Sequence, residues 1–315
     1  MTRRVQIVLA AILLLLFCLD FIWGAASHFD IDYGNLRFIA LFGLLPLSVG
    51  VVYSVWRRDD RVASVMFGIA FLLLFAPLCT LLNYMAISVA GPRIDDLLAS
   101  YDRAMGIDWP GLMTFFLERP FVTAVLGLIY SISAFQVAAA IAVIGYRSEA
   151  RDIALICIAT VICAWSTIAF WTAAPSLGAY TVYDVSAIGR KLGMVIDRSY
   201  PDFLVWVLAH GPGRIDALNA KGLIGFPSFH TQEVIIAWWY LRRQPRPVFV
   251  AVSIFSLLAL AAVPVQGGHH VIDVFGGIAF AAAGIWAAPK ILRLIEGRMT
   301  LSRPLATSSA LESNE

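Results

Sequence analysis

The sequence has little charge. Only 14% of its 315 residues are Asp, Glu, Lys or Arg, whereas 60% are hydrophobic and the mean hydropathy is +0.81. A water-soluble domain carries about 25% charged residues, so this composition excludes a soluble globular protein. The formal net charge is only +2, and no basic face is interleaved with aromatic residues, which excludes a nucleic-acid-binding surface.

Cysteines and the common metal motifs are also scarce. The four cysteines form no C-x-x-C pair and all fall inside apolar runs, so we interpret them as small packing residues. No H-E-x-x-H motif is present, which argues against a zinc metalloprotease, and no carboxylate cluster indicates a magnesium site. The chain has no internal repeat and no soluble second domain. A transporter with inverted repeats is therefore a weaker alternative.

Long apolar runs are what the sequence has instead. Each is long enough to cross a bilayer, for which about 20 residues are needed. The first run lacks an A-x-A cleavage site and is interrupted by Asp20, so we expect a retained span rather than a signal peptide. The sequence predicts an all-α polytopic membrane bundle of about eight transmembrane helices, at residues 5–23, 36–56, 62–90, 120–145, 152–173, 223–241, 247–265 and 271–292.

The distribution of positive charge predicts the orientation. If the N-terminus is cytoplasmic, the short cytoplasmic segments and the tail from Lys290 hold 14 of the 23 Lys and Arg residues. Both termini then face the cytoplasm, and two long loops, at about 91–119 and 174–222, lie on the opposite side. In these loops we expect short interfacial helices, including an amphipathic piece at 201–209. The polar tail, 299–315, is predicted to be disordered.

Three ionisable residues stand where two predicted spans begin on that opposite side. His230 lies near the start of the sixth span, and His269 and Asp273 lie at the start of the eighth. Ionisable groups inside a membrane are functional candidates by default. Because His269 and Asp273 are four residues apart, a helix would place them on one face, and the carboxylate would leave one imidazole nitrogen free to act as a nucleophile. His270 would point roughly 100° away, which favours a supporting or interfacial role.

The segment GFPSFHT, residues 225–231, supplies a complementary set of groups. Pro227 suits a first helical turn, and Ser228 is suited to be either a helix cap or a phosphate ligand. Free amides at a helix N-terminus favour an anion, and His230 just behind them is placed to protonate a departing alkoxide. A zinc site formed by His230, His269 and Asp273 is an open alternative.

These motifs carry a family resemblance. P-S-x-H, followed about forty residues later by H-x-x-x-D, resembles the type 2 phosphatidic acid phosphatase superfamily. The longer strings GLIGFPSFHT and PVQGGHHVIDVFGG resemble its bacterial members related to inositolphosphotransferases, such as inositol phosphorylceramide synthase. The resemblance implies a six-helix catalytic domain over 61–298 behind accessory helices in 1–60. It also implies a bacterial inner-membrane protein with a periplasmic active site.

The same resemblance implies a mechanism without metal or cofactor. His269 would attack phosphorus and form a phosphohistidine, Asp273 would orient it, and His230 would act first as acid and then as base. A catalytically inactive scaffold is disfavoured because all three positions are filled.

The phosphate-binding motifs depart from the family pattern. The arginine usual six residues before the second histidine is Val263 here, and the K-x-x-x-x-x-x-R-P motif is matched only by Lys191 and Arg198, followed by Ser199. We therefore expect Ser228, Lys191 and Arg198 to contact phosphate. Fewer cations suit a singly charged phosphodiester. The predicted function is thus transfer of a phospho-headgroup between a membrane lipid and an alcohol. The alternative is hydrolysis of phosphatidate-like or polyprenyl (di)phosphate substrates by water, and the second alternative is a non-enzymatic transporter.

Overall fold

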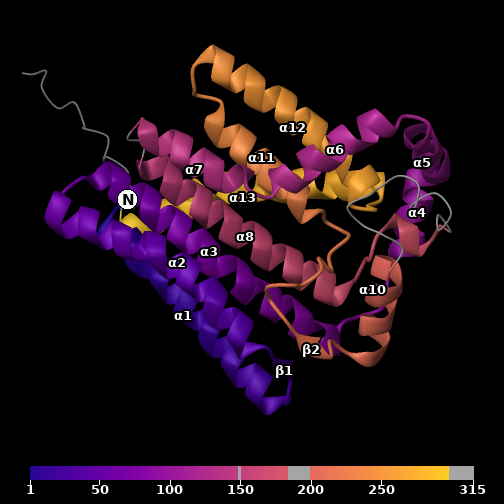
Figure 1. Cartoon of the computed structure of the whole chain (residues 1–315), viewed down its shortest axis with the longest axis horizontal. Coiled ribbons are helices and arrows are strands. Elements are labelled where there is room, and N and C mark those ends of the chain that lie inside the picture. The colour runs from indigo at the N-terminus through magenta and orange to yellow at the C-terminus, as the bar shows by residue number, and fades with distance from the viewer. Residues whose placement is uncertain (148–149, 184–198, 298–315) are drawn as a thin grey trace, which may run out of the picture.

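The computed structural model describes residues 1–147, 150–183 and 199–297, and most of these residues are helical (Figure 1). Two short strands, β1 (Asp30–Ile31) and β2 (Arg214–Ile215), pair in parallel and join the α1–α2 connection to a distant loop. The helices are α1 (Arg3–Ala26), α2 (Tyr33–Val52), η1 (Tyr53–Arg57), α3 (Asp60–Ala86), η2 (Ile87–Val89), α4 (Asp95–Ala104), α5 (Trp109–Leu117), α6 (Pro120–Ser133), α7 (Gln136–Tyr146), α8 (Ala150–Ala173), η3 (Ala179–Thr181), α10 (Ser199–His210), α11 (Phe229–Leu241), α12 (Arg246–Gln266) and α13 (Val271–Glu296).

Six helices within the described residues are long and apolar enough to cross a membrane, and a bent pair of helices, α5 with α6, raises the number to seven if it is counted as one span. The predicted all-α polytopic bundle is confirmed, and the short helices expected in the two long loops are present as α4, α5 and α10. The six are α1, α2 extended through η1, α3 extended through η2, α8, α12 and α13.

Two of the eight predicted spans differ in the structure. The run at 120–145 is divided into α6 and α7, and the run at 223–241 contains only the 13-residue α11. Helix α11 begins late because Ser228 is its N-cap, with Pro227 lying before the helix rather than in its first turn. A hydropathy window averages over such a cap and therefore extends the span too far toward the N-terminus.

Helix α8 lies at the centre of the bundle. In its most apolar 18-residue window 72% of the residues are buried, against 22% for α1 and 11% for α2. Helices α3, α7, α11 and α13 pack around it. A Cβ atom on Gly284 of α13 would stand 2.5 Å from the Cys163 sulfur of α8, so this glycine permits a close helix approach. Cys157 and Cys163 are buried packing residues, as expected, whereas Cys18 is exposed on α1.

Buried polar side chains join the inner helices. The Gln232 amide of α11 donates to the Thr167 hydroxyl of α8 over 2.8 Å, and the Gln136 amide of α7 donates to the Ser256 hydroxyl of α12 over 2.9 Å. Such bonds hold helices together where the lipid offers no competing partner. The bond between Gln232 and Thr167 fixes the position of α11, which carries one of the candidate catalytic histidines.

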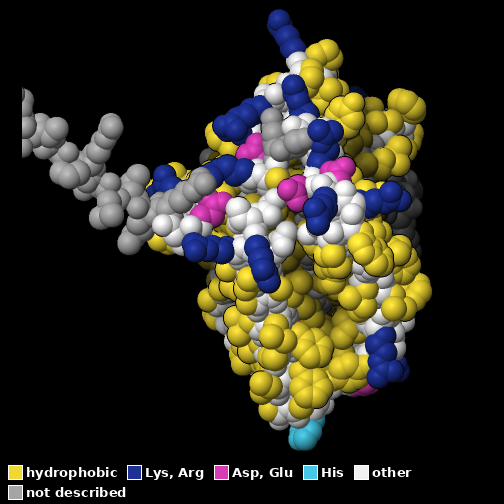
Figure 2. Space-filling model, turned by 90° about the vertical axis from the view of Figure 1, so that its left-hand side faces the viewer, with side chains coloured by type: hydrophobic (Ala, Val, Ile, Leu, Met, Phe, Trp, Pro, Cys, Tyr) yellow, Lys and Arg dark blue, Asp and Glu magenta, His cyan; other side chains and the backbone are white. Residues whose placement is uncertain are grey.

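The basic segments gather at one end of the bundle. Arg4 donates to the Glu296 carbonyl over 2.8 Å, Arg151 pairs with the Glu296 carboxylate, and Arg243 pairs with Asp152. These contacts place the starts of α1 and α8 beside the ends of α11 and α13. Figure 2 shows many Lys and Arg side chains on this face, above a broad hydrophobic surface. The starts of α11 and α13 therefore lie at the opposite end.

The first two helices lie at the periphery. Helix α2 packs mainly on α3, and α1 packs on α3 and α13. The separation of 1–60 from a catalytic domain at 61–298 stays a prediction.

Candidate active site

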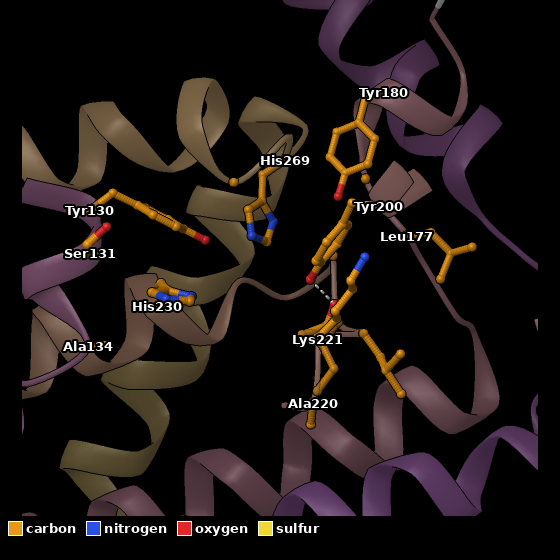
Figure 3. Close-up of a pocket in the computed structure, with 16 residues that line it drawn as sticks. Tyr130, Ser131, Ala134, Leu177, Tyr180, Tyr200, Ala220, Lys221, His230 and His269 are labelled. Carbon is orange, nitrogen blue, oxygen red and sulfur yellow. Dashed lines mark hydrogen bonds between the residues drawn. The ribbon is translucent and has the colours of Figure 1, made fainter. Parts of the chain in front are cut away.

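A pocket of about 500 Å³ opens at the end of the bundle opposite the basic face. Figure 3 shows its two sides: His230, His269 and Tyr130 face Tyr180, Tyr200 and Lys221 across it. Backbone of Gly178, Gly222, Gly225 and Gly267 forms part of the wall. No Asp or Glu is among the described lining residues, so the interior is suited to an anionic ligand.

His269 and Asp273 form a hydrogen-bonded pair. The distance from His269 Nδ1 to Asp273 Oδ2 is 3.0 Å, and the Asp273 side chain is completely buried. An ionised carboxylate can only accept, so Nδ1 carries the proton and Nε2 keeps its lone pair. The pair does not share a helix face as predicted, because α13 begins at Val271 and His269 precedes it. The helix places Asp273 in its first turn, from which its carboxylate reaches back to the imidazole.

The loop that carries His269 is fixed on several sides. The His269 carbonyl oxygen accepts from Trp109 Nε1 over 2.9 Å, and the backbone N–H of His270 donates to Asp273 Oδ2 over 3.0 Å. Gly268 has a φ of +64°, which favours glycine. A Cβ at this position would also stand 1.4 Å from the Tyr180 ring. The loop therefore has little freedom to move the His269 ring.

His230 reaches the same pocket from α11. Its ring stacks on Tyr130, with centroids 4.6 Å apart and planes inclined by 20°. Ser228 caps the helix by accepting from the Thr231 N–H over 3.3 Å, and its own N–H donates to the Asp273 carbonyl over 3.1 Å. This backbone bond joins the starts of α11 and α13, so the structure brings His230, His269 and Asp273 together. A contact between Ser228 and phosphate stays a prediction.

Lys221 is a pocket residue that the sequence reasoning missed. Its Nζ lies 5.4 Å from the Tyr200 ring centroid and 5.0 Å from that of Phe203. Its backbone is held by Tyr84, whose hydroxyl accepts from the Lys221 N–H and donates to the Lys221 carbonyl, both over 2.9 Å. Lys221 is the only Lys or Arg among the described lining residues.

The two tyrosines beside Lys221 are hydroxyl donors. Burial raises the pKa of Tyr180 and of Tyr200 well above the usual value for a phenol. Both side chains therefore stay protonated over the whole physiological range of pH. Tyr200 uses its hydroxyl to donate to the Gly222 carbonyl, which holds the glycine-rich wall in place.

Two acidic residues of α4 were also missed. Asp102 accepts from the backbone N–H groups of Val271 and Ile272, each over 2.9 Å, and so caps α13 from another helix. Asp95 accepts from the Ser176 hydroxyl and from the Leu177 and Gly178 N–H groups over 2.8–3.0 Å. Their spacing of seven residues on one helix was a sign that both face the same way.

Two other residues were predicted to contact phosphate. Lys191 and Arg198 lie outside the described residues. Val263, at the position where the family pattern has arginine, is buried on α12 and does not line the pocket. Among the described residues, no three His, Cys, Asp or Glu side chains are grouped as metal ligands. The zinc alternative therefore has no ligand set in this part of the chain.

Comparison with known proteins gives one finding that identifies a family. The family model described as PAP2 superfamily matches residues 96–287, which is more than half of the chain. This match begins at the second residue of α4 and continues into α13, so it covers His230, His269, Asp273 and Lys221 but not Asp95. No curated protein and no solved structure gives a significant match.

Proposed function

The chain belongs to the PAP2 superfamily, and from that premise we propose that it is a membrane enzyme that acts on lipid phosphates through a covalent intermediate on His269. The observation that carries the proposal is the 3.0 Å bond between His269 Nδ1 and Asp273 Oδ2 in a pocket that His230 also lines. Family membership favours this enzymatic function over the transporter alternative. The branch related to inositolphosphotransferases stays a prediction from the motifs.

The first chemical step is attack of His269 Nε2 on phosphorus. A bond from nitrogen to phosphorus forms while the bond from phosphorus to the leaving oxygen breaks, and protonated His230 gives that oxygen its proton. The His269 ring becomes positively charged while Nδ1–H stays bonded to Asp273. The negative carboxylate stabilises that charge in a buried site, where electrostatic interactions are strong.

The second step regenerates the enzyme. His230, now neutral, takes a proton from the acceptor hydroxyl, and the acceptor oxygen attacks the phosphohistidine and displaces His269. Water as acceptor gives hydrolysis, whereas a lipid or polyol alcohol gives transfer. The proton returns to His230, so the two steps balance and both histidines recover their starting states. Neither step requires a cofactor.

We favour transfer of a phosphodiester-linked headgroup over hydrolysis of a monoester. A monoester phosphate carries up to two negative charges and is usually held by several cations. The described wall of the pocket supplies a single ammonium, from Lys221, and Val263 contributes no charge. A polyol acceptor such as inositol is proposed only from the motif resemblance. If Lys191 and Arg198 also bind the phosphate, hydrolysis of a monoester becomes the better supported hypothesis.

The orientation of the pocket follows from the basic face. Because the Lys- and Arg-rich end of the bundle is expected in the cytoplasm, the pocket would open on the periplasmic side of a bacterial inner membrane. The enzyme would then act on headgroups in the outer leaflet of that membrane.

The test is a turnover assay with purified protein in detergent micelles. The substrates are dioleoyl phosphatidate, a polyprenyl phosphate and dioleoyl phosphatidylinositol, each with and without glycerol or inositol as acceptor. With the diester we expect the phospho-headgroup to pass to the alcohol while diacylglycerol is released, and we expect loss of all turnover in His269→Ala. His210→Ala is the matched control, since His210 is exposed and packs on Trp206 away from the pocket.

Two results would overturn the proposal. Full turnover in His269→Ala would remove the nucleophile. Release of inorganic phosphate from the monoester, with no transfer of a phospho group to any alcohol offered, would show that the enzyme is a phosphatase and would refute transfer.

A further inference from the structure

His270, beside the nucleophile, is enclosed by carboxylates. Its ring is fully buried, with Nε2 3.8 Å from Asp95 Oδ1 and Nδ1 3.7 Å from Asp102 Oδ2. Neither nitrogen makes a hydrogen bond within the described residues. A buried ring between two carboxylates is stabilised when both of its nitrogens carry protons, because one positive charge then lies between two negative charges.

The two carboxylates are held as anions by other donors. Asp102 accepts from two N–H groups of α13, and Asp95 accepts from three donors of the 176–178 segment in addition to its ion pair with Arg93. Burial alone would raise the pKa of each carboxyl, but nearby His270 and these donors lower both. Two buried anions on one helix require a counter-charge, and His270 is placed to supply it.

The charge state of His270 agrees with this arrangement. Burial alone would lower its pKa, but Asp102, Asp95 and Asp273 raise it to about 9. Besides those three carboxylates, two other titratable or charged groups lie near the ring among the described residues. Arg93 forms an ion pair with Asp95, and Tyr180 of η3 interacts electrostatically with Asp95 and Asp273.

The cluster of His270, Asp95 and Asp102 connects both walls of the pocket. Asp102 holds the start of α13, and Asp95 holds the segment before η3. These two segments meet where the Ala179 N–H donates to the Gly268 carbonyl over 2.7 Å. The His270 N–H then donates to the carboxylate oxygen that orients His269. Any shift of His270 therefore displaces Asp273 relative to the nucleophile.

We propose that His270 is a positioning residue, which as an imidazolium clamped between Asp95 and Asp102 holds Asp273 and His269 in the geometry for attack. The inference rests on the proposed function and deepens it, since it explains how α4 sets the direction of the nucleophile. It also predicts a dependence on pH. Because the pKa of His270 is raised to about 9 in the folded protein, the stability that the clamp contributes is fully present below about pH 6.5 and is lost as the pH rises through about 9.

The experiment compares kcat, measured as diacylglycerol released, of the wild type and His270→Gln at saturating dioleoyl phosphatidylinositol with inositol, and at saturating dioleoyl phosphatidate, from pH 6 to 10. At pH 7 we expect kcat to fall 10- to 100-fold in the variant, with KM changed less than threefold. The ratio of the two kcat values should fall toward one above pH 9, because the wild type then loses the same charge. Taking the ratio removes the titrations of other groups that both proteins share.

Two further variants separate charge from shape. In His270→Gln with Asp95→Asn, removal of one of the two carboxylates that faced the imidazolium should recover at least threefold in kcat over His270→Gln alone. Asp32→Asn is the matched control, because Asp32 also joins two segments by pairing with Arg214 yet does not line the pocket. It should keep the wild-type profile.

The outcomes distinguish this inference from the proposed function. A ratio that stays constant from pH 6 to 10, with His269→Ala inactive, refutes the clamp alone. Activity in His269→Ala refutes the proposed function. If His270→Gln proves too inactive for kinetics, the melting temperature decides: its difference from the wild type should shrink above pH 9, and a difference independent of pH overturns the clamp.

Discussion

Replacing Asp273 with Asn tests how the carboxylate assists the nucleophile. Asp273 Oδ2 accepts both from His269 Nδ1 and from the His270 N–H, each over 3.0 Å. In Asp273→Asn the amide oxygen must occupy this position, because the NH₂ group would oppose the His270 N–H. The proton on His269 therefore stays on Nδ1 and the shape of the site is kept. What the variant loses is the negative charge.

The expected magnitude follows from that charge. Attack makes the His269 ring positive, and two unit charges about 4 Å apart at an effective dielectric constant of about 20 interact by about 4 kcal/mol. Each factor of ten in rate corresponds to about 1.4 kcal/mol. We therefore expect kcat of Asp273→Asn to fall about 10²- to 10³-fold with KM little changed. Because both hydrogen bonds persist, the free energy of unfolding should change by less than about 1 kcal/mol.

A second substitution at the same position separates charge from hydrogen bonding. Asp273→Leu removes the acceptor as well and leaves the buried His270 N–H without a partner, which costs about 1–3 kcal/mol of stability. Its kcat should fall at least tenfold below that of Asp273→Asn. The assays are steady-state turnover at pH 7, which gives kcat, single-turnover formation of the phosphoenzyme, and thermal unfolding in the same detergent. A kcat for Asp273→Asn within threefold of the wild type would refute this account of the pair.

Two further predictions concern the loop and the topology. Gly268→Ala should lower both the melting temperature and the activity, because the new Cβ would collide with the Tyr180 ring. Gly106 has a similar positive φ but nothing within 4 Å of a Cβ, so Gly106→Ala should lose only about 1–2 kcal/mol of stability. Equal effects of the two substitutions would show that the structure relaxes around the collision. Ser100→Cys, exposed at the pocket end, should react with an impermeant thiol reagent in intact cells, whereas Arg246→Cys, exposed at the basic end, should not; reversed labelling would place the pocket in the cytoplasm. Labelling requires a Cys18→Ser background, since Cys18 is the only exposed cysteine.

Much of the bundle was predictable from the sequence because the bilayer imposes a simple rule. A stretch of about 20 apolar residues predicts a helix whatever its partners, and six such helices are present in the part of the chain that the structure describes. The rule failed at 223–241 and at 120–145, where local signals decide. The Ser228 cap and the break between α6 and α7 each change the hydropathy of only one or two positions, so an average over 18 residues does not detect them.

The sequence predicted the site residues only where short motifs place ionisable groups in apolar segments. His230, His269 and Asp273 stood out because ionisable groups are rare in apolar segments. Asp95 and Asp102 lie in a polar loop region, where carboxylates are ordinary, and only the folded chain shows that they are buried against His270. Lys221 was missed for the same reason. A charge in a loop carries information only when the fold shows what it faces.

Lys221 offers a measure of the charge on the substrate. A charge-assisted bond from its ammonium to a phosphate oxygen is worth about 1.5–3 kcal/mol, which is about 10- to 100-fold in kcat/KM. Lys221→Met should therefore raise KM for a bound phosphodiester by that factor and leave kcat within threefold. Lys221→Arg should restore most of the loss. The control is Lys290→Met, since Lys290 also lies over an aromatic ring, that of Trp286, but on the C-terminal half of α13.

In Lys221→Met, KM for a doubly charged monoester should rise more than KM for a diester, because the removed charge interacts with both negative charges of the monoester. If monoester and diester kinetics are unaffected by Lys221→Met, the ammonium does not meet the phosphate, and the cations that hold it must be sought among Lys191 and Arg198.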